Sequence, residues 1–354
     1  MTDLEKLCSR VTETAGCAVI TDDVNRRYFT AMKSSAGTLV VFPEKAYFII
    51  DFRYIEKAKK TVTACEVILQ DKLYEQINSL IEKHGAKTVS VNADTCTLSE
   101  LIAYQQKLNA EVIADTKLAE IIREIRTVKS QEQIDKIIKA QRIAEKGFAH
   151  MLDFIKVGRT EKEIQLELDY YMLKNGAEAL SFDTIALSGS NTSLPHGVPS
   201  DKKVESGEFV LMDFGATYDG WHSDMTRTVC VGKPSDKMKS VYETVLNAQL
   251  SALDAVKAGM SGKELDKIAR DIITDAGYGD NFGHSLGHGV GVEIHESPYA
   301  SPSREDILPE NSIVTVEPGI YLEGKFGVRI EDFVVVTENG CINMTKAPKE
   351  LICL

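Results

Sequence analysis

The sequence has few of the residues that mark disulfide-rich or fibrous proteins. Its 354 residues include seven cysteines, nine prolines and one tryptophan, and no two cysteines form a Cys-x-x-Cys pair. An odd number of scattered cysteines argues against a disulfide framework and suits a reducing cytoplasm. Glycine accounts for 24 residues without a regular period, which excludes a collagen-like chain.

Long apolar runs and an excess of positive charge are also missing. Residues 1–7 are polar and mixed in charge, and no apolar stretch approaches the roughly 20 residues that cross a bilayer. The chain carries 53 acidic and 41 basic side chains, a net charge of −12, which disfavours nucleic-acid binding. We therefore expect a cytoplasmic protein with neither a membrane nor a nucleic-acid partner.

The acidic excess lies in one part of the chain. Residues 1–127 hold 17 basic and 18 acidic side chains, whereas residues 128–354 hold 24 and 35. A charged surface that keeps the protein in solution is one explanation. Carboxylates that face inward and hold cations are the other, and the positions of the acids have to decide between them.

The length favours two domains. In residues 1–125 strand-like runs and helical patterns alternate, and Pro43-Glu44-Lys45 separates two β-rich runs as a hairpin connection does. This alternation predicts a compact α/β domain. The expected elements are strands at 38–42, 46–50 and 88–91 and helices at 71–84 and 97–108.

The second domain, residues 126–354, contains an internal repeat. It opens with Ser130 and Gln133, spaced as the capping box of a long helix. Further on, residues 152–176 and 253–277 share seven identities, including both glycines of the pattern. Each copy has the pattern of a helix, a glycine turn, a capped helix and a terminal glycine. Two such halves closing on one another would leave a cleft between them.

The first copy is followed by a ribbon with two acids. Asp219-Gly220 is a strong hairpin turn. With the turn there, Asp213 faces Thr226 and Asp224 is a diagonal neighbour. With the turn one residue earlier, Asp213 faces Asp224 directly. Either register puts both carboxylates on one side of the ribbon, because side chains alternate along a strand.

The second copy is followed by a similar ribbon. A turn centred at Gly324 places Glu317 opposite Glu331, and Pro318 predicts a bulge or an edge beside Glu317 because proline removes a ladder donor. Each half thus supplies a hairpin with two acids that face the same way.

Such pairs need compensation, because like charges across a ribbon are destabilising. A solvated face would supply it, but the apolar neighbours of these acids argue against solvent exposure. Arg227 and Arg329 could neutralise one charge each. Two divalent cations, which prefer hard oxygen ligands, would neutralise all four carboxylates.

Five of the seven histidines lie between positions 196 and 295. His284, His288 and His295 share one glycine-rich stretch, and His196 lies in a loop bounded by proline and glycine. Glycines let a backbone approach a ligand closely, so packing is a poor explanation for three histidines in this stretch. A phosphate-binding loop is the weaker alternative, because no G-x-G-x-x-G or Lys-Ser/Thr follows a strand.

These motifs together resemble the pita-bread metallopeptidases. Residues 1–125, with Asp51-Phe52-Arg53-Tyr54, look like the N-terminal domain of aminopeptidase P, prolidase and creatinase. The implied fold class is α+β: a pita-bread catalytic domain with an internal two-fold repeat, preceded by a smaller creatinase-like α/β domain. The segments that carry the resemblance are 211–215, 224–228, 287–291, 295–296, 316–321 and 328–332.

The resemblance implies a dinuclear site and a set of residues beside the substrate. The divalent ions would be Mn²⁺, with Co²⁺ or Zn²⁺ as alternatives, and they would activate a water molecule while Glu317 shuttles its proton. Trp221 stands where the family commonly has tyrosine, and we expect a change of packing there. The implied metal ligands are Asp213, Asp224, His288, Glu317 and Glu331; the implied catalytic residues are Glu317, His295, His196 and His284; the implied substrate-binding residues are Tyr321 and Arg329.

The activity that we expect is hydrolysis of the Xaa-Pro bond at the N-terminus of peptides, as in aminopeptidase P. The substrate would be a peptide with proline at its second position, and the resemblance also implies a homodimer. A prolidase that cleaves Xaa-Pro dipeptides is the alternative. A non-enzymatic pita-bread binding module and a hydrolase of another C–N bond are the competing classes.

Overall fold

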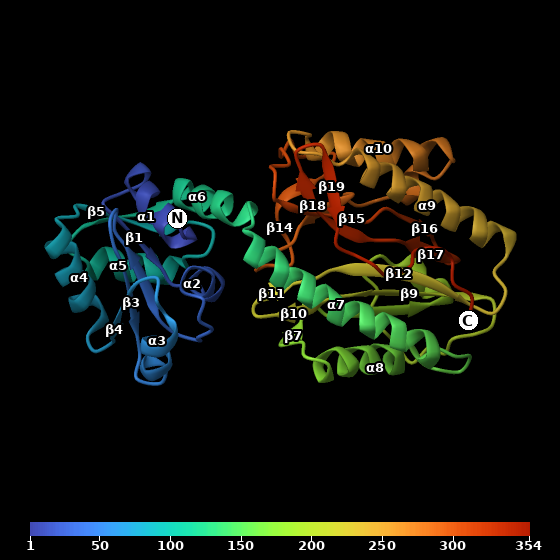
Figure 1. Cartoon of the computed structure of the whole chain (residues 1–354), viewed down its shortest axis with the longest axis horizontal. Helices are drawn as coiled ribbons and strands as arrows, with labels where there is room; N and C mark the ends of the chain where they lie inside the picture. The colour runs from blue at the N-terminus through green and yellow to red at the C-terminus, as the bar shows by residue number, and fades with distance from the viewer. The chain divides into compact units, whose positions relative to one another are not determined.

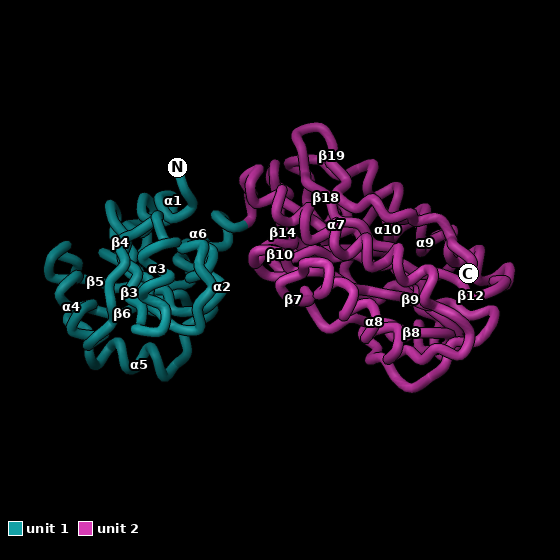
Figure 2. The backbone as a smooth tube through the Cα atoms, turned by 60° about the horizontal axis from the view of Figure 1, so that its bottom comes forward, with its two compact units in different colours: residues 1–126 teal, residues 127–354 magenta.

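The computed structural model describes all 354 residues, and they form two compact units, residues 1–126 and 127–354 (Figure 2). The sequence-based boundary lies between residues 125 and 126. None of the helices is both long and apolar enough to cross a membrane.

Unit 1 is a six-stranded mixed sheet with helices on both faces. The sheet order is β4-β3-β2-β1-β5-β6, in which β3–β4, β1–β5 and β5–β6 are parallel and the other pairs antiparallel. Its elements, in chain order, are α1 (Asp3–Arg10), β1 (Cys17–Ile20), α2 (Asp23–Thr30), β2 (Thr38–Val41), β3 (Ala46–Ile50), α3 (Ile55–Thr61), β4 (Glu66–Leu69), α4 (Leu73–His84), β5 (Thr88–Asn92), α5 (Leu98–Lys107), β6 (Glu111–Asp115) and α6 (Thr116–Thr127).

The sheet of unit 1 is buried on both faces because its strands alternate between two cores. In β3, Phe48 packs with α1, α2, α3 and α6, whereas Tyr47 and Ile49 face α4 and α5. This is the two-residue period of a strand covered on both sides. The expected hairpin of β2 and β3 and the expected helices α4 and α5 are confirmed.

Unit 2 consists of two similar halves. Figure 1 shows the helix pairs α7–α8 and α9–α10 outside the strands that they cover. The first half contains α7 (Gln131–Phe154), α8 (Glu161–Lys174), β7 (Ala179–Leu180), β8 (Ile185–Ser188), β9 (Glu208–Phe214), β10 (Ala216–Tyr218), β11 (Trp221–His222) and β12 (Met225–Val231). The second contains α9 (Asp236–Ala255), α10 (Gly262–Asp275), β13 (Gly287–Gly289), β14 (Glu296–Ala300), β15 (Ile313–Val316), β16 (Gly319–Leu322), β17 (Phe326–Arg329), β18 (Asp332–Thr337) and β19 (Gly340–Asn343).

The sequence repeat corresponds to the helix pairs. Each copy covers the end of a long helix, a glycine with positive φ (Gly158 or Gly259) and a second helix. Thr160 and Ser261 cap these second helices through capping boxes with the glutamates three residues later. Local sequence signals are sufficient to predict where these helices begin and end, because caps and positive-φ glycines act within one turn of a helix terminus.

Candidate active site and metal centre

The ribbon of the first half changes strand partners where its acids lie. β9 pairs with β8 and β12, whereas β10, after Gly215, pairs with β7 and β11. A Cβ at Gly215 would collide with the carbonyl oxygen of Ser223, so only glycine allows this crossing. Asp213 lies opposite Thr226, and Asp219 and Gly220 form the turn with positive φ angles. The structure therefore has the first of the two expected registers.

The ribbon of the second half is interrupted in the same way. β15 pairs with β18, with Val316 opposite Asp332, whereas β16 pairs with β17, with Gly319 opposite Arg329. Both ladders keep one register, which leaves Glu317 opposite Glu331 in the gap between them. The ladder breaks at Glu317 and Pro318, as the missing proline N–H requires.

The acids and histidines of the two halves meet in one cavity of about 480 Å³. All predicted site residues except Tyr321 line it. Phe182, Ile185, Ile294 and Tyr299 add apolar surface, and Asp183 adds another acid. The predicted lining residues are Asp213, Asp224, His288, Glu317, Glu331, His196, His284, His295 and Arg329.

Ligand atoms of Asp224, His288 and Glu331 lie within 4.8 Å of one another. The Nδ1 atom of His288 lies 3.0 Å from the carbonyl oxygen of Gly289, which can only accept, so Nδ1 carries a hydrogen. The Nε2 atom therefore faces the carboxylates of Glu317, at 3.3 Å, and Asp224, at 3.6 Å.

The site has more negative charge than its own cations neutralise. Arg329 pairs with Asp213 at 2.5 Å between Nη2 and Oδ2, and His288 lies beside Glu317. Burial raises the pKa values of Asp224 and Glu331 well above the ordinary range, and the neighbouring carboxylates raise them further. Two cationic side chains, Arg329 and His288, thus face four carboxylates.

The donor set fits bound cations. Oδ1 of Asp213 and Oε1 of Glu331 are buried and accept no hydrogen bond. A buried carboxylate oxygen without a partner is costly, and a hard divalent ion satisfies such oxygens. Burial opposes charge on His288 and Glu317 too, yet their contact raises the pKa of His288 to about 9 and lowers that of Glu317 to about 2.

Two threonines orient the carboxylates. The hydroxyl of Thr226 donates to Oε2 of Glu331 at 2.8 Å, and that of Thr315 donates to Oε1 of Glu317 at 3.1 Å. Thr226 comes from the first half and Glu331 from the second, so this bond joins the two halves. Such outer partners fix the direction in which a ligand carboxylate presents its remaining oxygen.

The histidines take different positions around this cluster. His295 is exposed at the cavity, with its ring centroid 4.3 Å from that of His288. His196 is also exposed, on the loop after β8. His284 is half-buried, and its Nε2 lies 2.9 Å from the hydroxyl of Tyr321. Burial lowers the pKa values of His284 and His295, and the latter is lowered further by His288.

Tyr321 lies behind the lining and joins two of the predicted residues. Its hydroxyl accepts from Nη1 of Arg329 at 2.7 Å and faces His284. Nδ1 of His284 lies 2.8 Å from the carbonyl oxygen of Ser285, so Nε2 of neutral His284 accepts from the tyrosine hydroxyl. Tyr321 thus holds His284 and Arg329 in position.

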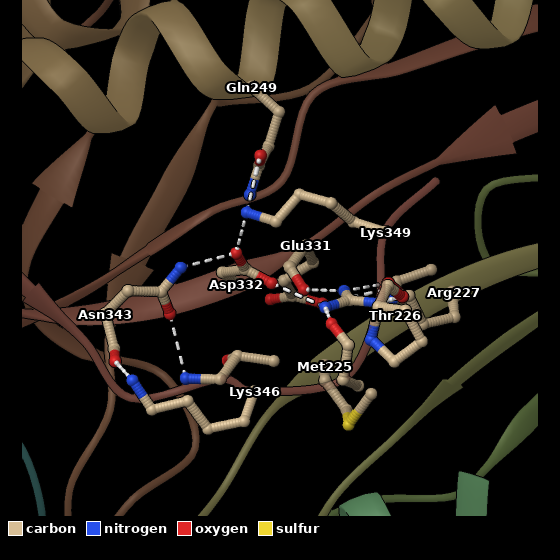
Figure 3. A network of polar contacts seen from close by, with 12 residues as sticks. Met225, Thr226, Arg227, Gln249, Glu331, Asp332, Asn343, Lys346 and Lys349 are labelled. Carbon is tan, nitrogen blue, oxygen red and sulfur yellow. Dashed lines mark hydrogen bonds and ion pairs between the residues drawn. The ribbon is translucent and has the colours of Figure 1, made fainter. Parts of the chain in front are cut away.

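Arg227 lies in a buried network behind Glu331 (Figure 3). It was a candidate to neutralise an acid of the cluster, but it pairs with Asp332 instead, at 2.7 Å between Nη2 and Oδ1. All five of its N–H groups are used, since Nε, Nη1 and Nη2 also donate to backbone carbonyls. Those acceptors belong to Thr226, Glu331, Ala347 and Pro348.

The network fixes the backbone of Glu331 from behind. Lys349 and Asn343 donate to the other oxygen of Asp332. Burial alone would raise the pKa of Asp332, but the positive charges of Arg227 and Lys349 hold it below its usual value. Breaking one side of such a buried pair costs about 3–5 kcal/mol because the remaining charge stays buried.

Sequence reasoning missed Thr226 and Thr315 as orienting residues, and it missed Asp332 altogether. The partners of Thr226 and Asp332 are distant in sequence, so no local pattern distinguishes these two from ordinary strand residues. Thr315 lies only two residues before its partner Glu317, and that spacing was the available signal. Trp221 is buried beside the Asp219-Gly220 turn, opposite Tyr218, and does not line the cavity.

Comparison with known families and structures agrees with this architecture. Residues 135–338 match the model of metallopeptidase family M24, and residues 10–128 match the creatinase/prolidase N-terminal domain. A Xaa-Pro dipeptidase from Bacillus anthracis has 41% sequence identity and a TM-score of 0.95, with 99% of each chain covered. The Xaa-Pro dipeptidase of Pyrococcus furiosus is 40% identical over 352 residues, 99% of each chain.

An X-Pro aminopeptidase from Thermotoga maritima is similar as well, with 38% identity and a TM-score of 0.91 over 100% of both chains. The expected fold class is confirmed: an α+β pita-bread unit follows a creatinase-like domain. The chain therefore belongs to metallopeptidase family M24 and is a metal-dependent peptidase.

Proposed function

We propose that the chain is a prolidase, which hydrolyses Xaa-Pro dipeptides. The observation that carries the proposal is the convergence of the four predicted carboxylates and four histidines on one cavity, with two buried carboxylate oxygens unpartnered. The names of the relatives favour dipeptides, since two of the three reported above are Xaa-Pro dipeptidases. The names of the relatives give no specific support to the aminopeptidase P activity that we expected from the sequence. That activity is the second candidate, because one relative is named an X-Pro aminopeptidase, from Thermotoga maritima.

Asp213, Asp224, His288, Glu317 and Glu331 would hold two divalent ions. The unpartnered oxygens of Asp213 and Glu331 and the raised pKa values of Asp224 and Glu331 support this set. Mn²⁺ is our first choice, with Co²⁺ or Zn²⁺ as alternatives. Bound in pairs, such ions polarise the scissile carbonyl and lower the pKa of a coordinated water molecule towards neutrality.

The chain's own groups would move the proton and hold the substrate. Glu317 would accept a proton and pass it to the leaving nitrogen, since its contact with His288 lowers its pKa and keeps it ionised at neutral pH. His295, exposed beside His288, would donate a hydrogen bond to the oxyanion. His196 would contact the substrate, and His284 with Tyr321 would keep Arg329 in place.

The apolar part of the cavity suits a proline ring. Phe182, Ile294 and Tyr299 line it together with the charged cluster. A pocket that is apolar on one side and carries a few placed polar groups is the usual design for a small ligand. The proline ring of a substrate would pack against these apolar side chains.

Peptide length tests the proposal. Protein loaded with Mn²⁺ is assayed with Ala-Pro, Ala-Pro-Ala and Ala-Ala, using Asp224→Ala as the control for contaminating peptidases. We expect the highest kcat/KM for Ala-Pro and little turnover of Ala-Ala. A clear preference for Ala-Pro-Ala would establish the aminopeptidase P activity instead. Inert behaviour towards both proline peptides, with two metal ions bound, would point to another C–N bond or to a binding module.

Two further expectations belong to the same proposal. The homodimer is tested by light scattering on a size-exclusion column, where the mass of a single chain, 39.1 kDa, would contradict it. A cytoplasmic location agrees with the seven cysteines, all of which are free thiols.

A further inference from the structure

The two loops that carry His196 and His284 are each held by a buried acid that lies outside the cavity. In each half, the second helix of the helix pair carries a buried acid that contacts the ends of the histidine loop. These acids are Glu161 of α8, 0% exposed, and Asp266 of α10, 1% exposed. Neither lines the cavity.

Glu161 holds both ends of the loop from Ser188 to Ser200. Its Oε1 accepts from the backbone N–H of Ser188 at 2.7 Å and from Nδ2 of Asn191 at 3.1 Å. Its Oε2 accepts from the backbone N–H of Ser200 at 3.0 Å and from the Ser200 hydroxyl at 2.6 Å. One carboxylate therefore closes the loop at its base.

The middle of this loop is held by the second half of unit 2. The hydroxyl of Thr192 accepts from the backbone N–H of Gly327 at 2.8 Å, and the carbonyl oxygen of Pro195 accepts from Nη1 of Arg329 at 3.3 Å. Between these holds, His196 reaches the cavity with an exposed side chain. Its place depends on the backbone on both sides.

The hydrogen bonds that Glu161 accepts from Ser188, Asn191 and Ser200 all come from neutral donors. The cation Lys202 reaches Glu161 only through Ser188: its Nζ donates to the Ser188 hydroxyl at 3.1 Å, and that hydroxyl donates to Glu161 at 3.2 Å. Glutamine has the same shape but replaces one acceptor oxygen with a donor NH₂ group. In Glu161→Gln the new NH₂ group therefore faces a hydrogen-bond donor of either Ser188 or Ser200, and the bond at that end of the loop is lost.

The second half achieves the same result with different residues. Oδ1 of Asp266 accepts from the backbone N–H of Leu286 at 2.9 Å. Arg270, paired with Asp266 at 2.7 Å, donates to the carbonyl oxygens of Phe282 and His284 at 2.8 Å each. In the repeat Glu161 aligns with Gly262 and Asp266 with Gln165, so the two anchors are not copies of one ancestral residue.

We infer that Glu161 and Asp266 are positioning residues, which hold the loops of His196 and His284 at the substrate. The inference rests on the proposed function, because it assumes that these histidines serve substrate binding and catalysis. The two acids do not contact the substrate; they act by keeping the histidine loops in position.

A double-mutant cycle tests the inference for Glu161. The Mn²⁺-loaded wild type, Glu161→Gln, His196→Ala and the double variant are compared on Ala-Pro. We expect Glu161→Gln to lower kcat/KM on the order of tenfold and to have little further effect once His196 is alanine. A full, multiplicative loss in the double variant would overturn the inference, since a general structural defect acts with or without His196.

Glu163→Gln is the matched control. Glu163 lies on the same helix but is bound only to Thr160 and Arg159, so the variant loses an exposed glutamate that does not contact the loop. We expect unchanged kcat/KM. An effect equal to that of Glu161→Gln would also overturn the inference. The corresponding pair for the second loop is Asp266→Asn with Asp271→Asn, whose carboxylate is bound to Lys267.

Hydrogen exchange gives a readout that needs no activity. Peptides covering residues 188–200 should exchange faster in metal-loaded Glu161→Gln than in the wild type, while the metal content and exchange in α8 stay unchanged. If Glu161→Gln does not fold, Ser200→Ala removes the 2.6 Å bond to Glu161 and the 3.2 Å bond from the backbone N–H of Lys202, and it leaves the other bonds of Glu161 in place. It should give a smaller change in the same peptides. Unchanged exchange in the loop would refute the anchor. A wild type that cleaves no Xaa-Pro peptide would refute the proposed function, and loop exchange would then still decide the anchor.

Discussion

Replacing Thr226 with valine should weaken metal binding without changing a metal ligand. Thr226 is fully buried, and its hydroxyl donates to Oε2 of Glu331 at 2.8 Å and accepts from Nε of Arg329 at 3.1 Å. Valine keeps the shape of the side chain and removes both bonds. The carboxylate of Glu331 is then free to turn, and its unpartnered oxygen no longer has a fixed direction.

The expected loss follows from the partners. Hydrogen bonds to charged groups contribute about 1.5–3 kcal/mol, and changes to the groups that hold a metal ligand lower affinity by about 10–100-fold. We therefore expect the Kd of the Mn²⁺ ion held by Glu331 to rise by about 10–100-fold. Calorimetric titration of metal-free protein with Mn²⁺ measures it.

Thr228→Val is the matched control two residues along the same strand. Thr228 is as deeply buried, and its hydroxyl donates to the carbonyl oxygen of Arg329 at 3.0 Å, which is a neutral partner. The same hydroxyl accepts from the backbone N–H of Arg329 at 3.4 Å. The loss of each of these two neutral bonds should lower the free energy of unfolding by about 0.5–1.5 kcal/mol and leave Mn²⁺ affinity nearly unchanged. If both variants weaken Mn²⁺ binding equally, the hydroxyl of Thr226 has no specific effect on Glu331 and the reasoning fails.

Three further outcomes can be checked on the same protein. Asp224→Ala should lose bound metal and turnover together, measured by elemental analysis and the Ala-Pro assay; full metal content with normal turnover would contradict the ligand set. His295→Ala should lower kcat on the order of 10²-fold while the metal stays bound, and a loss of metal would instead identify His295 as a ligand. In the metal-free protein His288, with a pKa of about 9, is protonated at pH 7, so metal binding must release that proton and affinity must fall as the pH drops below about 9. Titration in two buffers of different ionisation enthalpy measures the release, and its absence at pH 7 would refute this assignment of charge.

The expectations that the structure confirms depend on local physics. Capping boxes at Thr160 and Ser261 and the turn at Asp219-Gly220 act within a few residues, so the sequence alone predicts where helices begin and where the first ribbon folds back. The alternation of side chains along a strand likewise predicts that Asp213 and Asp224 point to the same side of the ribbon. The sequence could not choose between two registers of that ribbon, because both satisfy the alternation.

The residues behind the site escaped prediction because their partners are distant in sequence. Glu161 reads locally as an ordinary acid in the first turn of a helix, yet its carboxylate meets Ser188 and Ser200, which come much later in the chain. Arg227 reads locally as a strand residue three positions after Asp224, and only the folded unit shows that it pairs with Asp332 and not with the cluster.

The sequence by itself determined the proposed chemistry of this protein: it supplies four carboxylates, spaced on two ribbons, and a histidine that would together hold two cations. The tertiary structure decided how those side chains are held, through Thr226 across the two halves, Arg227 beneath them and Glu161 at the loop. The physical reason is that ligand type and strand alternation are local properties, whereas the burial and the hydrogen-bond partners of a side chain exist only after the two halves have closed on one another.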